Sequence, residues 1–291
     1  MNLSKWKLTS VAAAALMTTI LGCGNGLKVP FQEDRIDGKP IDFARLEAEL
    51  PLTVEARMSI TPKNLKDLSQ EQIDQIYGRL TVGPIPEGPY DGDLFFPAGV
   101  DGDSRLAEIF GGGLKGLLAD VGTQKTEFIG RSMWKGKVFY PEQMLLRNRM
   151  EDRLLIKPLL GAEPLDTIEM IEVNGKDAYL LFPAKLYCGQ SLLDGRRESL
   201  IIDYAFTDKL PGYRRDPDRL AGRNGFAVRD EIRMVRPGFY LGRAYLKRAF
   251  LLNFTLIKND VVERDSDAFA ESGGKVREDC WAGEQFLTAS D

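Results

Sequence analysis

Apolar and polar residues alternate along most of the second half of the chain, and this pattern narrows the choice of fold more than any other. From Phe128 onward the repeat is two residues, which is typical of half-buried β-strands. Asn174-Gly175 and Asp194-Gly195 are hairpin signals between such runs, and Pro237-Gly238 is a third turn. The predicted strands are Phe128–Tyr140, Met144–Met150, Arg153–Pro158, Thr167–Val173, Ala178–Cys188, Ser199–Phe206, Ala227–Val235, Phe239–Leu246 and Phe250–Ile257.

Short strands joined by turns, with no helices between them, argue against a parallel sheet. We therefore predict a mainly β (α+β) fold, in which an antiparallel meander closes into a barrel or a strongly curved half-barrel behind a few N-terminal helices. An outer-membrane barrel is disfavoured, because arginines within the strands leave no continuous apolar outer band.

The N-terminus carries a targeting signal. Lys5 and Lys7 precede an uncharged stretch from Leu8 to Leu21. This stretch is too short to cross a hydrocarbon core of about 30 Å, which needs about 20 residues. It fits the apolar region of a secretory signal peptide, which we place at residues 1–22. A buried helix of the folded domain is the alternative, but the stretch lacks a polar face.

The sequence Ile20-Leu21-Gly22-Cys23 resembles the lipobox of bacterial lipoproteins. The resemblance implies that the chain is cut just before Cys23, and that this cysteine is acylated on its sulfur and on the new amine. Two or three acyl chains would hold the protein on a membrane durably. Gly24 stands where an aspartate would resemble the inner-membrane retention signal. The implied location is the outer membrane, on its periplasmic face.

The mature chain divides by composition into four parts. Residues 23–40 mix Gly, Pro and charges as a lipidated tether would. Residues 41–125 form a helical region, with helices at 42–50, at 106–121 and from the capping box Ser69-Gln70-Glu71-Gln72 to Leu80, and with a loop at 83–92. The β-barrel domain is placed at residues 126–258. Residues 259–291 are predicted to form an acidic, weakly ordered tail.

Two cysteines remain in the mature chain besides Cys23. Cys188 and Cys280 are free to pair in an oxidising periplasm. Spacing alone does not show that their Cα atoms approach within bonding distance, so two separate thiols are the alternative.

Composition excludes several kinds of chemistry. The chain has no histidine, which rules out Ser-His-Asp and Cys-His catalysis and H-E-x-x-H zinc sites. The net charge of −4 gives no basic field for nucleic acid. There is no P-loop, Rossmann fingerprint or zinc-spaced cysteine set, so we expect no cofactor and no metal.

Strand alternation places polar residues among apolar ones. Asp230 shares a strand face with Val228, Ile232 and Met234, so it points into the core if the apolar face is inside. Such a carboxylate has a raised pKa or a buried partner. We expect an interior cluster that serves a polar ligand head group or acid–base catalysis, with a structural salt bridge as the alternative. The catalytic candidates are Asp203 and Asp230, and the ligand-binding candidates are Trp134, Asp203, Asp230, Arg243 and Asn253.

One local pattern resembles a known family. Trp134-Lys135-Gly136-Lys137-Val138-Phe139 is similar to the W-x-G-K-x-F stretch of GXWXG-type domains, which are small bacterial β-rich proteins without an assigned activity. The segment Asp230–Val235 is loosely similar to the domain that follows in that family. The resemblance implies a β-barrel and no function. Trp134 is then interpreted as a large side chain that packs in the core from a strand, with a ligand contact as the alternative.

These observations favour a membrane-anchored periplasmic β-barrel lipoprotein whose interior binds an apolar or amphiphilic small ligand. Two alternatives stay open. One is a histidine-free isomerase, cyclase or hydrolase that uses Asp203 or Asp230 as its base, and the other is an envelope protein that acts through surface contacts.

Overall fold

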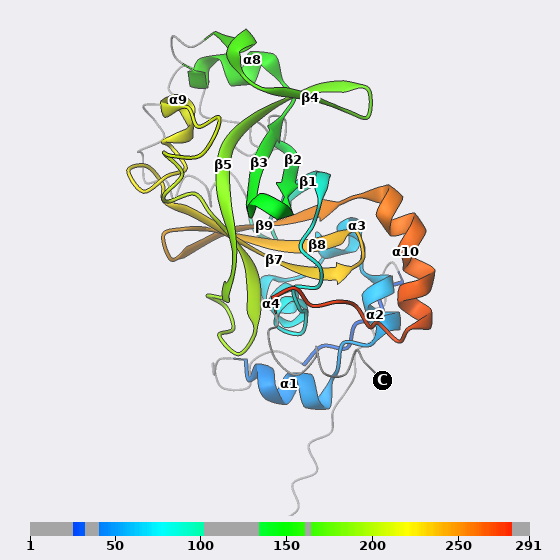
Figure 1. The fold of residues 1–291 in the computed structure, drawn as a ribbon. Coiled ribbons are helices and arrows are strands. Elements are labelled where there is room, and N and C mark those ends of the chain that lie inside the picture. The colour runs from blue at the N-terminus through cyan, green and yellow to red at the C-terminus, as the bar shows by residue number, and fades with distance from the viewer. Residues whose placement is uncertain (1–25, 33–40, 102–133, 161–163, 281–291) are drawn as a thin grey trace, which may run out of the picture.

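The computed structural model describes residues 26–32, 41–101, 134–160 and 164–280 (Figure 1). Nine strands form one antiparallel sheet in the order β3-β2-β1-β9-β8-β7-β6-β5-β4. Because β3 also pairs with β5, every strand except β4 belongs to a closed eight-stranded barrel. This confirms the predicted fold class in its closed form. The strands are β1 (Gly88–Phe95), β2 (Trp134–Tyr140), β3 (Leu145–Met150), β4 (Met170–Val173), β5 (Lys176–Gln190), β6 (Glu198–Asp203), β7 (Val228–Arg236), β8 (Phe239–Leu246) and β9 (Ala249–Ile257).

Among the described residues, four helices precede β1, one follows β9 and two short ones lie between strands. They are α1 (Phe43–Glu49), α2 (Val54–Ser59), α3 (Pro62–Leu65), α4 (Gln70–Gly78), α8 (Arg153–Ile156), α9 (Arg215–Asp218) and α10 (Asn259–Glu271), with 3-10 turns at Pro141–Gln143, Lys157–Leu160 and Leu165–Thr167. The predicted capping box starts α4: the Gln72 N–H donates to Ser69 Oγ, and the Ser69 N–H donates to Gln72 Oε1. In the described part of the chain, no helix is long and apolar enough to cross a membrane.

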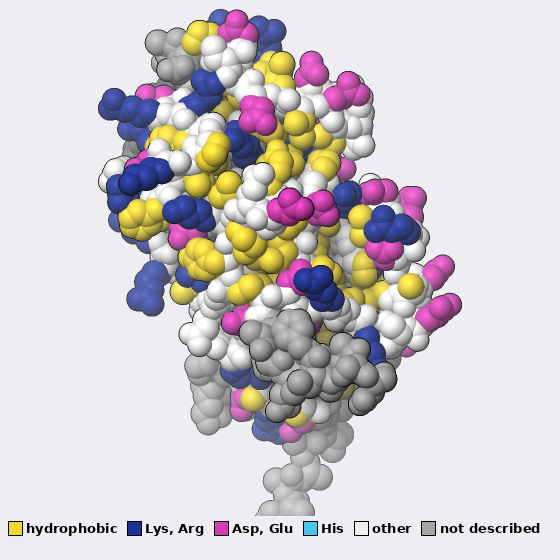
Figure 2. All heavy atoms as spheres, in the orientation of Figure 1, with side chains coloured by type: hydrophobic (Ala, Val, Ile, Leu, Met, Phe, Trp, Pro, Cys, Tyr) yellow, Lys and Arg dark blue, Asp and Glu magenta, His cyan; other side chains and the backbone are white. Residues whose placement is uncertain are grey.

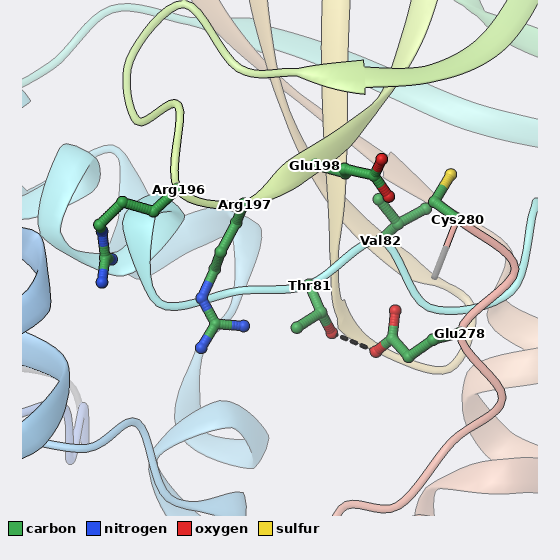
Figure 3. Close-up of a pocket in the computed structure, with 7 residues that line it drawn as sticks. All are labelled: Thr81, Val82, Arg196, Arg197, Glu198, Glu278 and Cys280. Atoms are coloured by element: carbon green, nitrogen blue, oxygen red, sulfur yellow. Dashed lines mark hydrogen bonds between the residues drawn. The ribbon is translucent and has the colours of Figure 1, made fainter. Parts of the chain in front are cut away.

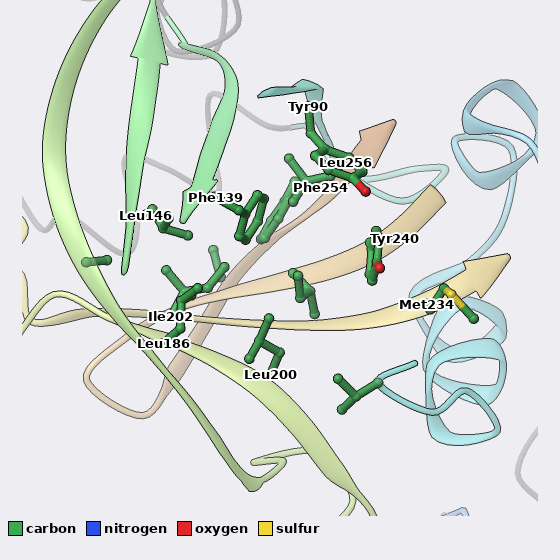
Figure 4. Packing of buried hydrophobic residues seen from close by; sticks show 14 of the residues in the cluster. Tyr90, Phe139, Leu146, Leu186, Leu200, Ile202, Met234, Tyr240, Phe254 and Leu256 are labelled. Carbon is green, nitrogen blue, oxygen red and sulfur yellow. The ribbon is translucent and has the colours of Figure 1, made fainter. Parts of the chain in front are cut away.

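The interior of the barrel is a packed core (Figure 4). Its members come from all eight strands of the ring, and its largest side chains are aromatic. Tyr90 meets Phe139 and Tyr240 edge to face, with ring centroids 5.6 and 5.7 Å apart. A second core lies between the helices and the outer face of β7 and β8, where Val235, Phe239 and Leu241 are fully buried.

One strand prediction and one loop prediction are wrong. Residues 153–158 form α8 and the start of a 3-10 turn instead of a strand. Asp152 starts this helix by accepting the Leu154 N–H, and Ile156 and Leu160 are buried four residues apart, which is helical spacing. The predicted loop at 83–92 is also too long, since β1 begins at Gly88 and pairs with both β2 and β9.

Three domain boundaries change as well. Because β1 belongs to the barrel, residues 41–125 are not a purely helical region. The predicted acidic tail begins with α10, whose Phe269 is buried beneath the Arg57 guanidinium. The predicted tether includes Leu27, Val29 and Phe31, which are buried in the second core. The signal peptide, Cys23, the predicted helix at 106–121 and residues 281–291 lie outside the described residues.

Candidate functional site

Asp230 lies inside the barrel, on the face that strand alternation predicts. It is opposite Ile202 of β6 and Ala244 of β8, and only 5% of its surface is exposed. Its buried partner is Lys137 of β2, whose Nζ lies 2.9 Å from Asp230 Oδ2. Two opposite charges therefore face each other within an apolar core.

Lys137 is the centre of a hydrogen-bonded group. Its ammonium donates to Asp230 Oδ2, to Asn148 Oδ1 (2.9 Å) and to Tyr204 Oη (2.7 Å). Trp134 Nε1 donates to the same Asn148 oxygen, at 2.9 Å. We call Trp134, Lys137, Asn148, Tyr204 and Asp230 the interior polar network.

The charges in this network are fixed by burial and by hydrogen bonds. Burial lowers the pKa of Lys137, and the charge of Asp230 opposes that shift. Burial, followed by Asp230, raises the pKa of Tyr204 well above its usual value, so its phenol stays protonated. An ammonium group has three protons, and all three have acceptors here. The network is therefore saturated, and it ties β2, β3 and β7 to the residue that follows β6.

The predicted interior cluster of Asp203, Asp230 and Arg243 does not form. Asp203 is opposite Arg229, on the other strand face from Asp230, and it accepts a hydrogen bond from the Tyr187 hydroxyl (2.9 Å). The physical reason is the two-residue period of a strand, which sends neighbouring side chains to opposite faces.

Arg243 and Asn253 also lie outside the barrel. They are opposite each other on β8 and β9, beneath α4. Arg243 forms an ion pair with Asp74 of α4, and Asn253 Nδ2 donates to Gln70 Oε1 at 2.8 Å. Both residues therefore attach the helical layer to the barrel. Of the predicted ligand-binding residues, only Trp134 and Asp230 come together.

The sequence reasoning missed Lys137, Asn148 and Tyr204. Lys137 alternates with Phe139 on β2, so the strand period alone places it on the buried face. Asn148 lies opposite Lys137 on β3. No sequence signal locates Tyr204, because it follows the end of β6.

A pocket lies beside the C-terminal segment, at the opposite end of β6 from Tyr204 of the interior polar network (Figure 3). Its volume is about 280 Å³. We call residues 275–280 the strap, because this segment crosses the chain between α4 and β1, and we call the pocket beside it the strap pocket. The lining comes from the start of β6, from the residues after α4 and from the strap: Thr81, Val82, Arg196, Arg197, Glu198, Glu278 and Cys280.

The strap is held at several points. Glu278 accepts hydrogen bonds from the Thr81 hydroxyl and from the Gly83 N–H (2.7 Å). Asp279 Oδ2 accepts from the Ile85 N–H at 2.9 Å. Cys280 is joined to Cys188 of β5 by a disulfide, with their Cα atoms 5.3 Å apart. The structure thus has the disulfide, which the sequence left as one of two alternatives beside separate thiols.

The arginines of the pocket already have acidic partners. Arg196 donates to Asp194 Oδ2 at 3.0 Å, and Arg197 pairs with Glu47 of α1. Burial and the charge of Arg233 lower the pKa of Arg197, while Glu278 opposes that shift. The pocket therefore combines charged groups with an apolar part made by Val82 and the disulfide.

No cluster of metal-ligating side chains occurs among the described residues. Comparison with protein-family models found no match, and no curated protein matches the chain. Among solved structures, the chain is similar to a protein from Thermomonospora curvata, at 16% sequence identity and a TM-score of 0.36. The match covers 70% of this chain and 97% of that one.

Proposed function

We propose that this chain is a lipid-anchored protein on the periplasmic face of the bacterial outer membrane, and that it binds a small amphiphilic molecule in the strap pocket. The observation that carries the binding role is the pocket itself, which brings charged groups and an apolar wall together at one end of the barrel. Its volume is near the lower end of the range for small-molecule sites, about 300 Å³.

The position of the pocket agrees with the packing of the barrel. Large side chains such as Tyr90, Phe139, Tyr240 and Phe254 occupy the interior, where a lipocalin-like protein would hold its ligand. The polar groups of the interior polar network already form hydrogen bonds with one another. We therefore place the ligand at the strap end instead of inside the barrel.

The proposed anchor would hold the domain close to the bilayer. Cys23 precedes the buried residue Leu27 by four positions. A chain of four residues reaches at most about 14 Å when fully extended. Acyl chains on Cys23 would therefore keep the start of the second core near the lipid head groups, without a long tether.

The anchor is tested by the mass and the location of the mature chain. Wild-type protein is expected in the membrane fraction, with a mass that fits a chain starting at Cys23 and carrying acyl chains. The Cys23→Ser variant is expected to lose both properties. A wild-type chain that keeps residues 1–22 or carries no lipid would contradict the proposed anchor.

The binding role is tested by native mass spectrometry of protein extracted gently from its membrane. Wild-type protein is expected to carry a small molecule. Glu198→Trp should lose that molecule, because its side chain fills the pocket, whereas Glu172→Trp on β4 is the matched control, since both glutamates are exposed on strands. An empty wild-type protein, or equal loading of the two variants, would contradict the proposed site.

A surface-contact role in the envelope is the second candidate. Figure 2 shows hydrophobic side chains reaching the surface across the middle of the viewed face. Exposed large hydrophobic residues of the described chain include Leu154, Met170 and Phe206. Crosslinking in intact cells would favour this role if one envelope protein were captured through Phe206 by wild type and lost in Phe206→Ala.

A further inference from the structure

The wall of the strap pocket depends on a covalent bond. Glu278 and Cys280 both belong to the strap, and the disulfide fixes the end of the strap to β5. The other contacts of the strap named above are hydrogen bonds at a part-buried surface. A cut disulfide would therefore leave this wall held by those carboxylate hydrogen bonds, which contribute about 1.5–3 kcal/mol each, by the Asp279 N–H bond to the Gly83 carbonyl and by the packing of Val276 on the barrel core.

The basic groups that line the pocket already have acidic partners. The lining itself is balanced, with Arg196 and Arg197 against Glu198 and Glu278. However, the two guanidinium groups are already bound by Asp194 and Glu47, which add two negative charges.

Two further arginines make the numbers of basic and acidic groups around the pocket equal. Glu278 also acts on Arg57, where it opposes the lowering of the pKa to about 10 by burial. Arg233 likewise acts on Arg197, so with Arg57 and Arg233 four basic groups face four acidic ones. Among the described residues, Glu198 is the lining charge without an ion pair, so a cationic group is favoured over an anionic one beside it.

The chemistry of the lining suggests where each part of a ligand would lie. The carboxylate of Glu198 stands at the start of β6, on an exposed residue, and in Figure 3 it points toward Cys280. Val82 and the disulfide provide the neighbouring apolar surface. A short apolar body with one ammonium group would place its charge near Glu198 and its body against Val82.

The geometry points to a binding site for a small organic cation with an apolar body, and to a site that exists only while the Cys188–Cys280 disulfide holds the strap. This inference rests on the proposed ligand-binding function and adds the ligand class and the redox dependence. Reduction by a dithiol would convert the disulfide into two thiols and oxidise the dithiol to its own disulfide. The strap would then lose its covalent attachment to β5 and would leave the pocket more readily.

Three probes of the same shape test the ligand class by titration calorimetry at low salt. They are 2-phenylethylammonium, neutral 2-phenylethanol and anionic 3-phenylpropanoate. We expect the cation to bind about tenfold more tightly than the neutral probe, which is a difference of about 1.4 kcal/mol. Glu198→Gln should weaken the cation about three- to fivefold, as for an exposed ion pair, while Glu172→Gln should not change it.

The disulfide is tested with the same cation. Binding should be lost in Cys280→Ser, and also in wild type treated with a dithiol, while near-UV circular dichroism shows that the barrel remains folded. Retained binding in folded Cys280→Ser would overturn the inference, as would equal binding of the anion. If Cys280→Ser does not fold, binding by folded, dithiol-treated wild type decides the redox dependence, and the comparison of Glu198→Gln with Glu172→Gln decides the ligand class.

The two proposals fail separately. A membrane-derived molecule bound to wild type, together with no preference for the cationic probe, would overturn the ligand class and leave the proposed function standing. If neither a membrane-derived molecule nor a probe binds, both proposals are contradicted.

Discussion

At the scale of single residues, the buried pair of Lys137 and Asp230 is the most consequential contact in the barrel. Removing water from two charges costs several kcal/mol, and only the complete set of hydrogen bonds offsets that cost. Side-chain exposures of 3% for Lys137 and 7% for Asp230 show that water cannot replace a lost partner. The network therefore stabilises one arrangement of the strands over others.

Lys137→Met should destabilise the fold by about 3–5 kcal/mol, because it leaves Asp230 buried without its partner. The double variant Lys137→Met/Asp230→Leu should recover much of that loss, since it removes both charges. Urea unfolding of the wild type and the three variants, including Asp230→Leu, gives the coupling energy. If the double variant lost as much stability as the two single variants together, Lys137 and Asp230 would not be coupled in the way proposed.

A second buried carboxylate should make stability depend on pH. Burial raises the pKa of Asp218 to about 6, against the effect of the backbone N–H groups of Arg214 and Phe182, which donate to it. The folded state therefore holds a proton that the unfolded chain releases above pH of about 4. The contribution of Asp218 to stability is complete below that pH and is lost as the pH rises through 6.

Asp218→Asn removes this titration. The stability deficit of the variant relative to wild type should be about 2 kcal/mol larger at pH 4.5 than at pH 7.5. Urea unfolding of both proteins at the two pH values measures it. A deficit that does not change with pH, or that grows at high pH, would show that Asp218 is ionised in both states.

At the scale of elements, the barrel depends on close contacts between neighbouring strands. Gly136 has a φ of 137°, and a Cβ atom there would lie 1.9 Å from the Tyr90 carbonyl oxygen of β1. No side chain fits between β1 and β2 at this point. The register of these strands therefore requires glycine.

Gly136→Ala should cost more than about 3 kcal/mol or prevent folding, because backbone must move to admit the methyl group. Gly195→Ala is the matched control: its Cβ would meet no atom within 4 Å, so its effect should stay within about 0.5 kcal/mol. Thermal unfolding of both variants makes the comparison. Equal effects would contradict the close packing of β1 on β2.

The strands and the capped helix are the parts that sequence predicts best. Period-two alternation located β7, β8 and β9, and the capping box located α4, because both signals are local. β1 escaped prediction because its sequence, GPYDGDLF, is rich in turn-forming residues, and its pairing with β9 is a tertiary contact. Only two of the five residues of the interior polar network, Trp134 and Asp230, were predicted, since its residues come from strands far apart in the chain.

At the scale of the whole molecule, the disulfide joins the C-terminal segment to the barrel. Cys188 and Cys280 are 92 residues apart, so their bond closes a long loop in the unfolded chain. The double variant Cys188→Ser/Cys280→Ser should lose about 4 kcal/mol by the chain-entropy account. Urea unfolding measures this loss, and wild type unfolded in a dithiol should give the same value. An unchanged free energy of unfolding would contradict this account.

The helical layer, the barrel and the strap together leave the pocket at one end and the interior polar network toward the other. We propose that a ligand from the membrane binds at the strap end. Hydrogen exchange followed by mass spectrometry tests it most directly, on wild-type protein with and without a membrane extract. We predict slower exchange at residues 81–85 and 275–280 when the extract is present. Slower exchange around Trp134 and Asn148 instead, or no change anywhere, would contradict the claim.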